Sequence, residues 1–268
     1  MQPLANITPL RRPSPAGSIE VRNAGRVFNT STQDVIALAD VSLDIEPGRF
    51  VVLVGPSGCG KSTLLMMLAG LLPQTTGIVT INGAPIPKPD PDRVGVVFQE
   101  ASLFPWLTAE ENVEFPLLLR GVAKAERRAK AQEAVRLVGL DGFGQRHPHE
   151  LSGGMKQRVS IARGLVQDPP VLLMDEPFAA LDEQTRMTMG DELLRIWAAT
   201  GKTVVFVTHS LTEAVYLADE VVVMSPRPGR IVDLLQVPLP RPRTFEMLRG
   251  DAFGSLRERI WRHIRKSA

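Results

Sequence analysis

A glycine-rich segment at residues 55–63 constrains this chain more than any other feature. It reads Gly55-Pro56-Ser57-Gly58-Cys59-Gly60-Lys61-Ser62-Thr63 and fits the phosphate-binding pattern G-x-x-x-x-G-K-[ST]. The apolar residues 50–54 before it, three of them valine, are typical of a buried parallel strand, and residues 64–69 after it favour a helix. Glycines let successive N–H groups turn inward, and a helix start adds partial positive charge. We therefore predict a nucleoside triphosphate site, with Lys61 on the β- and γ-phosphates and Ser62 on Mg²⁺.

A second apolar run ends in two carboxylates. Residues 171–174 are apolar, and Asp175 and Glu176 follow directly. Acids at the tip of a buried strand are costly unless they meet a cation or a hydrogen-bond network. We therefore predict that Asp175 holds Mg²⁺ and that Glu176 is the general base that polarises the attacking water.

Two more apolar runs end in polar residues. Residues 94–99 predict a buried strand with Gln99 at its carboxyl end, and residues 203–208 predict another that leads to His209. Taken alone, Gln99 could contact a metal ion or a water molecule, or it could simply end the strand with a polar side chain. A single histidine at the end of a strand, such as His209, usually has a structural role. Because ligands of open α/β sheets bind at the carboxyl ends of strands, the shared edge favours a functional site. Residues 210–213 predict a capping box that begins the next helix.

A second anion-binding helix start is predicted at Ser152-Gly153-Gly154, with a helix that continues to Val166. Bare backbone amides and the helix dipole suit an anion there. Capped helices are common, so this pattern alone is weak evidence for an anion site. It becomes informative because the same chain also carries a phosphate loop.

Upstream of that loop, alternating residues 19–22 and 41–45 predict half-buried strands of an antiparallel sheet. Phe28 lies between them. An aromatic ring can stack on a nucleobase, or it can simply join the core; the residues alone leave both open.

Residues 101–150 carry helical patterns and no convincing strand. Residues 108–111 predict a capping box, and residues 125–138 predict an amphipathic helix with Arg127 on its solvent side. The loop Leu103–Leu107 is unusually apolar, so either it folds under these helices or it forms an exposed patch for a partner.

Composition narrows the class of protein. A chain of 268 residues accommodates one α/β domain with an insertion, and a net charge of +2 gives no support to a nucleic-acid partner. We expect no membrane span and no signal peptide, because no apolar run approaches the required length and Arg11 and Arg12 precede prolines. The single Cys59 excludes an internal disulfide and suits a reducing cytoplasm.

Both ends differ from the rest of the chain. Residues 1–17 are rich in proline and predict a flexible extension. Residues 240–268 hold eight basic and three acidic residues, and residues 253–264 predict a basic amphipathic helix. That helix either touches anionic lipid or packs on its own domain, and we favour packing.

In this order, the P-loop, Gln99, Leu151-Ser152-Gly153-Gly154-Met155-Lys156-Gln157, residues 171–176, Asp182 and His209 resemble the ATP-binding-cassette (ABC) ATPases. The likeness covers about residues 18–235. It implies an α/β P-loop NTPase (RecA-like) core, residues 18–100 and 157–239, with an N-terminal antiparallel β subdomain and an all-helical subdomain inserted at residues 101–156.

The resemblance also implies roles and partners. Phe28 would stack on adenine, and Asp182 would be the D-loop acid. Gln99 would contact the metal ion, and His209 would contact the γ-phosphate. Ser152, Gly153, Gly154 and Gln157 would bind the ATP held by a second copy, since two chains of this family pair head to tail around two ATP.

Residues 103–108 and 224–231 look like the nitrate, sulfonate, taurine and bicarbonate importer subfamily. The expected partners are a transmembrane permease, met by Phe104, Pro105, Trp106 and Leu107, and an extracytoplasmic solute-binding protein. The expected place is the cytoplasmic face of the inner membrane. The alternatives are an exporter ATPase and a cassette ATPase that acts on nucleic acid or the ribosome. The short spacing between the P-loop and Ser152 and the single cassette disfavour the second alternative.

Overall fold

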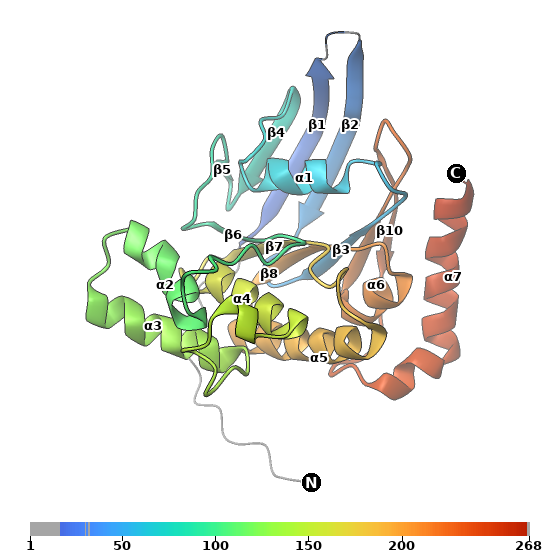
Figure 1. The fold of residues 1–268 in the computed structure, drawn as a ribbon. Coiled ribbons are helices and arrows are strands. Elements are labelled where there is room, and N and C mark those ends of the chain that lie inside the picture. Colours follow the sequence, from blue (N-terminus) through green and yellow to red (C-terminus); the bar gives the residue numbers. More distant parts are fainter. Residues whose placement is uncertain (1–16, 30, 32, 267–268) are drawn as a thin grey trace.

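The computed structural model describes residues 17–29, 31 and 33–266. Two sheets organise this part of the chain (Figure 1). The predicted extension, residues 1–17, lies outside the described residues except for Gly17. Gly17 is buried, its N–H donates to the Pro170 carbonyl at 3.5 Å, and its carbonyl accepts from the Thr203 hydroxyl at 2.6 Å.

The central sheet has six strands in the order β10-β9-β3-β8-β7-β6. Parallel pairing joins all of them except β10, which is antiparallel to β9. Residues of β3 and β8 are all buried, as expected for a parallel sheet covered on both faces. The strands are β3 (Phe50–Val54), β6 (Val94–Val97), β7 (Val171–Asp175), β8 (Thr203–Val207), β9 (Glu220–Met224) and β10 (Ile231–Gln236).

The second sheet is antiparallel, in the order β2-β1-β4-β5, and confirms the alternation seen in the sequence. Its strands are β1 (Ile19–Asn29), β2 (Asp34–Ile45), β4 (Thr76–Ile81) and β5 (Ala84–Pro85). Its inner face shares one hydrophobic core with α1 (Lys61–Leu68) and with Val51 and Leu53 of β3. The α1 helix therefore lies between the two sheets, as Figure 1 shows.

On the other face of the central sheet, the remaining helices share a second hydrophobic core with Phe50, Val52 and Val54. Alternate residues of β3 point to opposite faces, so one strand divides the two cores. The helices are α2 (Ala109–Leu119), α3 (Lys124–Leu137), α4 (Gly153–Leu165), α5 (Glu183–Thr200), α6 (Leu211–Leu217) and α7 (Asp251–Lys266), with short 3₁₀ turns at Pro148–Glu150 and Phe245–Arg249.

The helical insertion forms as predicted, with two differences. Thr108 and Glu111 make the complete capping box at the start of α2. Arg127 does not lie on the solvent side of α3, because its side chain is only 18% exposed and pairs with Glu114 of α2. The predicted boundary at residue 156 falls inside α4, which is one continuous helix.

The C-terminal helix packs on the rest of the molecule rather than standing apart. Phe253 and Ile260 of α7 are 1% and 0% exposed and belong to the core on the α6 side of the central sheet. Arg259 and His263 both contact Asp233 of β10, at 3.0 and 2.9 Å. The apolar stripe of this helix is therefore used inside the domain.

Candidate active site

The phosphate loop leaves the end of β3 and leads into α1. At Gly60, which precedes the helix, φ is +104°, and a Cβ atom would lie 2.6 Å from Leu38 Cδ2. Glycine is the residue that tolerates both conditions. The Lys61 ammonium donates to the carbonyls of Gly55 and Pro56 at 2.9 and 3.0 Å, so it lies across the loop.

Ser62 and Asp175 meet beside this loop. The Ser62 hydroxyl donates to Asp175 Oδ1 at 3.0 Å, although the two residues lie far apart in the sequence. Burial raises the pKa of the Asp175 carboxyl, and the hydrogen bond from Ser62 opposes that rise. A hydroxyl and a partly buried carboxylate make an oxygen donor pair of the kind that Mg²⁺ prefers.

Glu176 and His209 form the second pair at the edge. Glu176 Oε2 lies 3.1 Å from His209 Nδ1, and the Glu176 side chain is 26% exposed. Glu176 has φ +44°, and its N–H donates to the Val207 carbonyl at 3.0 Å. A non-glycine residue in that backbone region is uncommon and is typical of functional sites.

The strand order explains why these pairs meet. Strand β8 lies between β3 and β7, so the phosphate loop, His209 and the two acids follow neighbouring parallel strands. Gln99 comes after β6 at the same edge and is exposed. The prediction that the strand continues to Gln99 was wrong, because β6 ends at Val97 and Phe98 is 41% exposed.

The predicted second anion site lies at the start of α4. Ser152 is the N-cap and accepts from the Met155 N–H at 3.3 Å. Gly153 is exposed, whereas Gly154 is buried and Gln157, at 4% exposed, donates to the Phe98 carbonyl at 3.4 Å. Helices α1 and α4 pack on opposite faces of the central sheet.

Asp182 caps the start of α5. Its carboxylate accepts from the Thr185 N–H at 2.9 Å and from the Thr185 hydroxyl at 2.6 Å. The Thr185 hydroxyl and N–H lower the pKa of the Asp182 carboxyl. This N-cap was not foreseen from the sequence.

Phe28 lies on β1 and is partly buried, with the Arg26 guanidinium 4.7 Å from the centre of its ring. Arg26 also donates to the Pro73 carbonyl at 2.9 Å. One face of Phe28 is therefore already covered by a cation, and stacking on a base remains a prediction for the ring.

Cys59 does not offer its side chain to the phosphate site. It is fully buried, and its sulfur lies 3.7 Å from Lys61 Nζ on the core side of the loop. The predicted nucleotide contact of Cys59 would therefore fall to its backbone N–H, which here donates to the Pro56 carbonyl at 3.3 Å.

The apolar loop before α2 combines the two alternatives left open by the sequence. Leu103 packs against the core, whereas Trp106 is 71% exposed. Phe104 is partly buried, and the centre of its ring lies 4.6 Å from that of Phe115. Asn112, which is fully buried, holds the loop through hydrogen bonds to Phe104, Leu107 and Thr108. In the sequence, Asn112 could have been recognised as a structural residue because it is a polar residue on the predicted buried face of a helix.

Three residues beside the site were missed by sequence reasoning: Arg186, Thr208 and Glu213. The predicted capping box at α6 forms only in part. Ser210 accepts from the Glu213 N–H at 3.3 Å, but the Glu213 carboxylate turns inward to the Thr208 hydroxyl at 2.5 Å. Burial raises the pKa of the Glu213 carboxyl.

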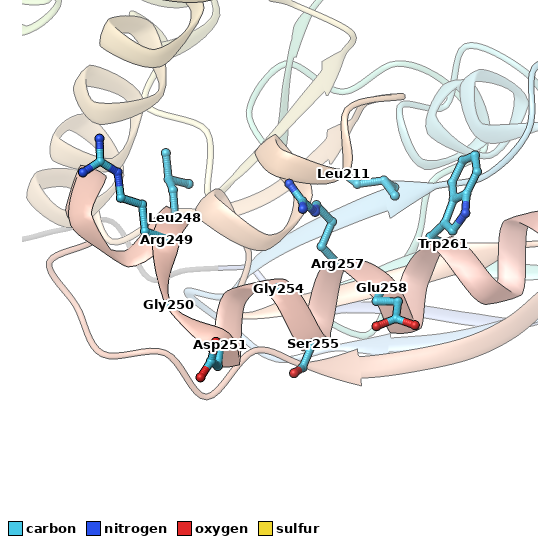
Figure 2. A pocket seen from close by; sticks show the side chains of 10 residues that line it. All are labelled: Leu211, Leu248, Arg249, Gly250, Asp251, Gly254, Ser255, Arg257, Glu258 and Trp261. Atoms are coloured by element: carbon cyan, nitrogen blue, oxygen red, sulfur yellow. The ribbon is translucent and has the colours of Figure 1, made fainter.

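A groove of about 720 Å³ lies between the start of α6 and α7, lined by Leu211, Leu248, Arg257, Glu258 and Trp261 among others (Figure 2). It holds none of the predicted site residues. Within residues 17–266, as far as they are described, no helix is long and apolar enough to cross a membrane. The same part of the chain has no cluster of three or more His, Cys, Asp or Glu residues that could hold a metal.

Comparison with known proteins agrees with this geometry. Residues 38–179 match the ABC transporter family model. An uncharacterized ABC transporter ATP-binding protein of Methanocaldococcus jannaschii is 49% identical over 225 residues, which cover 84% of each chain. A taurine import ATP-binding protein, TauB, of Burkholderia pseudomallei is 54% identical over 206 residues, which cover 77% of this chain and 79% of that protein.

A solved structure agrees as well. The ATP-binding cassette MJ0796, in a dimeric post-hydrolysis state with ADP and Pi, is 34% identical with a TM-score of 0.73. The match covers 83% of this chain and all of that one. The expected P-loop fold is confirmed, and the chain belongs to the ABC transporter family as an ATP-binding subunit whose ATPase activity is coupled to transport.

Proposed function

We propose that this chain is the ATPase subunit of an importer for a small anion such as taurine, another sulfonate or nitrate. The observation that carries the catalytic part is the contact of Glu176 with His209 at 3.1 Å, at the sheet edge that also holds the phosphate loop. The importer part is supported by the TauB relatives, whose printed name is taurine import ATP-binding protein.

In this proposal the backbone N–H groups of residues 55–63 bind the phosphates of ATP. Lys61 leaves the carbonyls of Gly55 and Pro56 to meet the β- and γ-phosphates. Glu176 accepts the proton of the attacking water, and His209 orients Glu176 and donates a hydrogen bond toward the γ-phosphate. Phe28 stacks on the adenine, and Asp182 and Gln99 line the approach to the γ-phosphate.

Ser62, Asp175 and Gln99 are the residues that would hold Mg²⁺. The contact of Ser62 with Asp175 at 3.0 Å fits a pair of ligands that meet at one ion. When bound, Mg²⁺ neutralises charge on the phosphate oxygens. Few protein ligands suit this ion, because it is usually held by one or two side chains together with phosphates and waters.

The second ATP contact is proposed to come from a partner copy. Ser152, Gly153, Gly154 and Gln157 of one chain would close on the γ-phosphate held by the other, so ATP favours a head-to-tail homodimer and hydrolysis releases it. The dimeric cassette MJ0796 with ADP and Pi supports this arrangement.

The remaining partners follow from the importer proposal. Phe104, Pro105, Trp106 and Leu107 would meet a transmembrane permease at the cytoplasmic face of the inner membrane, where exposed Trp106 provides an apolar contact. An extracytoplasmic solute-binding protein would deliver the anion. A nucleic-acid partner is not expected.

The substitution Glu176→Gln tests the catalytic assignment. We expect ATP hydrolysis to fall at least about 100-fold while ATP binding is retained, because the amide keeps the shape but accepts no proton from water. Light scattering should show an ATP-dependent dimer of the variant. Hydrolysis at the wild-type rate would contradict the role of Glu176.

A further inference from the structure

An ion pair between α5 and α6 contacts the residues that directly precede Asp182 and His209 in the chain. Arg186 Nε is 3.4 Å from Glu213 Oε1, and the two side chains are 20% and 11% exposed. Charges removed this far from water are costly unless each meets an opposite charge and hydrogen bonds of good geometry. The other hydrogen bonds of Arg186 and of Glu213 therefore show which segments the pair holds in place.

The Arg186 end of the pair holds the loop after β7. Its Nη2 group donates to the Leu181 carbonyl at 3.0 Å, and Leu181 directly precedes Asp182. The backbone N–H of Arg186 donates to the Asp182 carbonyl at 2.8 Å. The backbone bond is the ordinary one of a first helical turn, so the Arg186 side chain holds the segment Leu181–Asp182 through the Leu181 carbonyl.

The Glu213 end holds the turn that carries His209. Glu213 Oε2 accepts from the Thr208 hydroxyl at 2.5 Å, and that hydroxyl in turn accepts from the Ser210 N–H at 2.9 Å. Thr208 is 2% exposed, and its backbone N–H donates to the carbonyl of Leu53 on β3 at 3.3 Å. The residues on both sides of His209 are therefore fixed through one carboxylate.

We propose that Glu213 and Arg186 are a positioning pair that ties the Leu181–Asp182 segment to the His209 turn and so sets His209 against Glu176. The inference rests on the proposed catalytic function. Two apolar side chains of similar volume would fill the same space, but they would leave the Leu181 carbonyl and the Thr208 hydroxyl without these hydrogen bonds. The charged pair therefore keeps the Leu181–Asp182 segment and the His209 turn in a fixed position relative to each other.

The test measures kcat, the ATP dissociation constant and urea stability for Glu213→Gln, Arg186→Met and the double variant. We expect kcat to fall about 10- to 100-fold in each, since small displacements of a catalytic group have effects of this size. ATP binding should stay within about twofold, because neither residue touches the phosphate loop. The double variant should lose no more than the worse single one, because the two side chains act as a unit.

A milder variant guards against loss of the fold. Thr208→Val removes only the hydroxyl that joins Glu213 to the His209 turn, and it should lower kcat with ATP binding unchanged. The matched control is the exposed pair of Glu258 and Arg262 on α7, whose atoms lie 3.0 Å apart. Glu258, labelled in Figure 2, lies in the groove away from the predicted site residues, so Glu258→Gln should keep the wild-type kcat.

Three outcomes would overturn the positioning pair: an unchanged kcat in Glu213→Gln, Arg186→Met and Thr208→Val, additive losses in the double variant, or equal losses of kcat and ATP binding. Glu176→Gln separates this from a failure of the proposed function. If Glu176→Gln is inactive while Glu213→Gln, Arg186→Met and Thr208→Val are all fully active, only the positioning pair is wrong. If Glu176→Gln is active, the catalytic proposal itself fails.

Discussion

The folded protein without nucleotide disfavours the ionised form of the Asp175 carboxyl. Burial raises the pKa of its carboxyl above the ordinary value of 3.8, with the Ser62 hydroxyl acting in the opposite direction. The folded chain therefore holds this proton more tightly than the unfolded chain does. Its contribution to the free energy of unfolding is most favourable below that ordinary value and is lost as pH rises through the raised pKa. At neutral pH the ionised group is a net cost.

Asp175→Asn should therefore keep or raise the Tm measured at neutral pH without nucleotide, and it should abolish ATP hydrolysis. The amide removes the buried charge and still accepts from Ser62, but it is a poor Mg²⁺ ligand. Asp182→Asn is the matched control, because Thr185 lowers the pKa of the Asp182 carboxyl and no relief of a buried charge follows there. A clear drop in the Tm of Asp175→Asn would contradict this account.

The Cys59 thiol should react slowly with a maleimide in native buffer, with or without ATP, and rapidly in denaturant. Its side chain is fully buried, and thiol reactivity requires exposure as well as ionisation. Labelling followed by mass spectrometry measures both rates. Rapid native labelling that ATP prevents would place the thiol on the nucleotide side of the loop.

At the scale of elements, α7 is part of the core rather than an appendage. Its sequence predicts a basic amphipathic helix, but only the packing shows that the apolar stripe faces α6 and β9 instead of a lipid surface. Arg241, just upstream, stacks on Trp197 at 4.2 Å and pairs with Asp219 at 2.7 Å, which fastens the chain that leads into the helix.

Ile260→Ala should lower the free energy of unfolding by about 2–5 kcal/mol, the usual cost of removing a fully buried aliphatic side chain. Urea denaturation followed by circular dichroism measures the change. Arg257→Ala on the exposed side of the same helix should stay within about 0.5 kcal/mol. Equal small effects of the two substitutions would mean that α7 is not packed in solution.

At the scale of the whole molecule, one chain places its two predicted anion sites on opposite faces of the central sheet. The phosphate loop leads into α1, and Ser152 caps α4, each within a separate hydrophobic core. In the proposed function a composite ATP site therefore requires two chains, and an isologous pair would complete two such sites at once.

Ser152→Arg should bind ATP normally and lose hydrolysis, because the added side chain occupies the surface that closes on the partner's nucleotide. Equilibrium binding and phosphate release measure the two properties. Ser255→Arg, which adds the same group on α7, should hydrolyse ATP like the wild type. Loss of ATP binding in Ser152→Arg would mean that Ser152 acts within its own chain.

The sequence alone determined the family, the fold class and the order of the site residues. The P-loop, the acids after β7 and His209 were predictable because each is a local motif at the end of an apolar strand, where strand, turn and helix start depend on neighbouring residues. For the same reason the Thr108 capping box was found from four consecutive letters.

Only the tertiary structure decided which distant residues meet. The contact of Ser62 with Asp175, the inward turn of Glu213 to Thr208 and the burial of Cys59 all depend on strand order and on how helices pack across the sheet. The first contact joins residues remote in the chain. The second joins residues only five apart, but the direction in which the Glu213 carboxylate turns depends on its buried surroundings and not on the sequence spacing. Local patterns therefore indicated the chemistry of the site, and packing decided its connections.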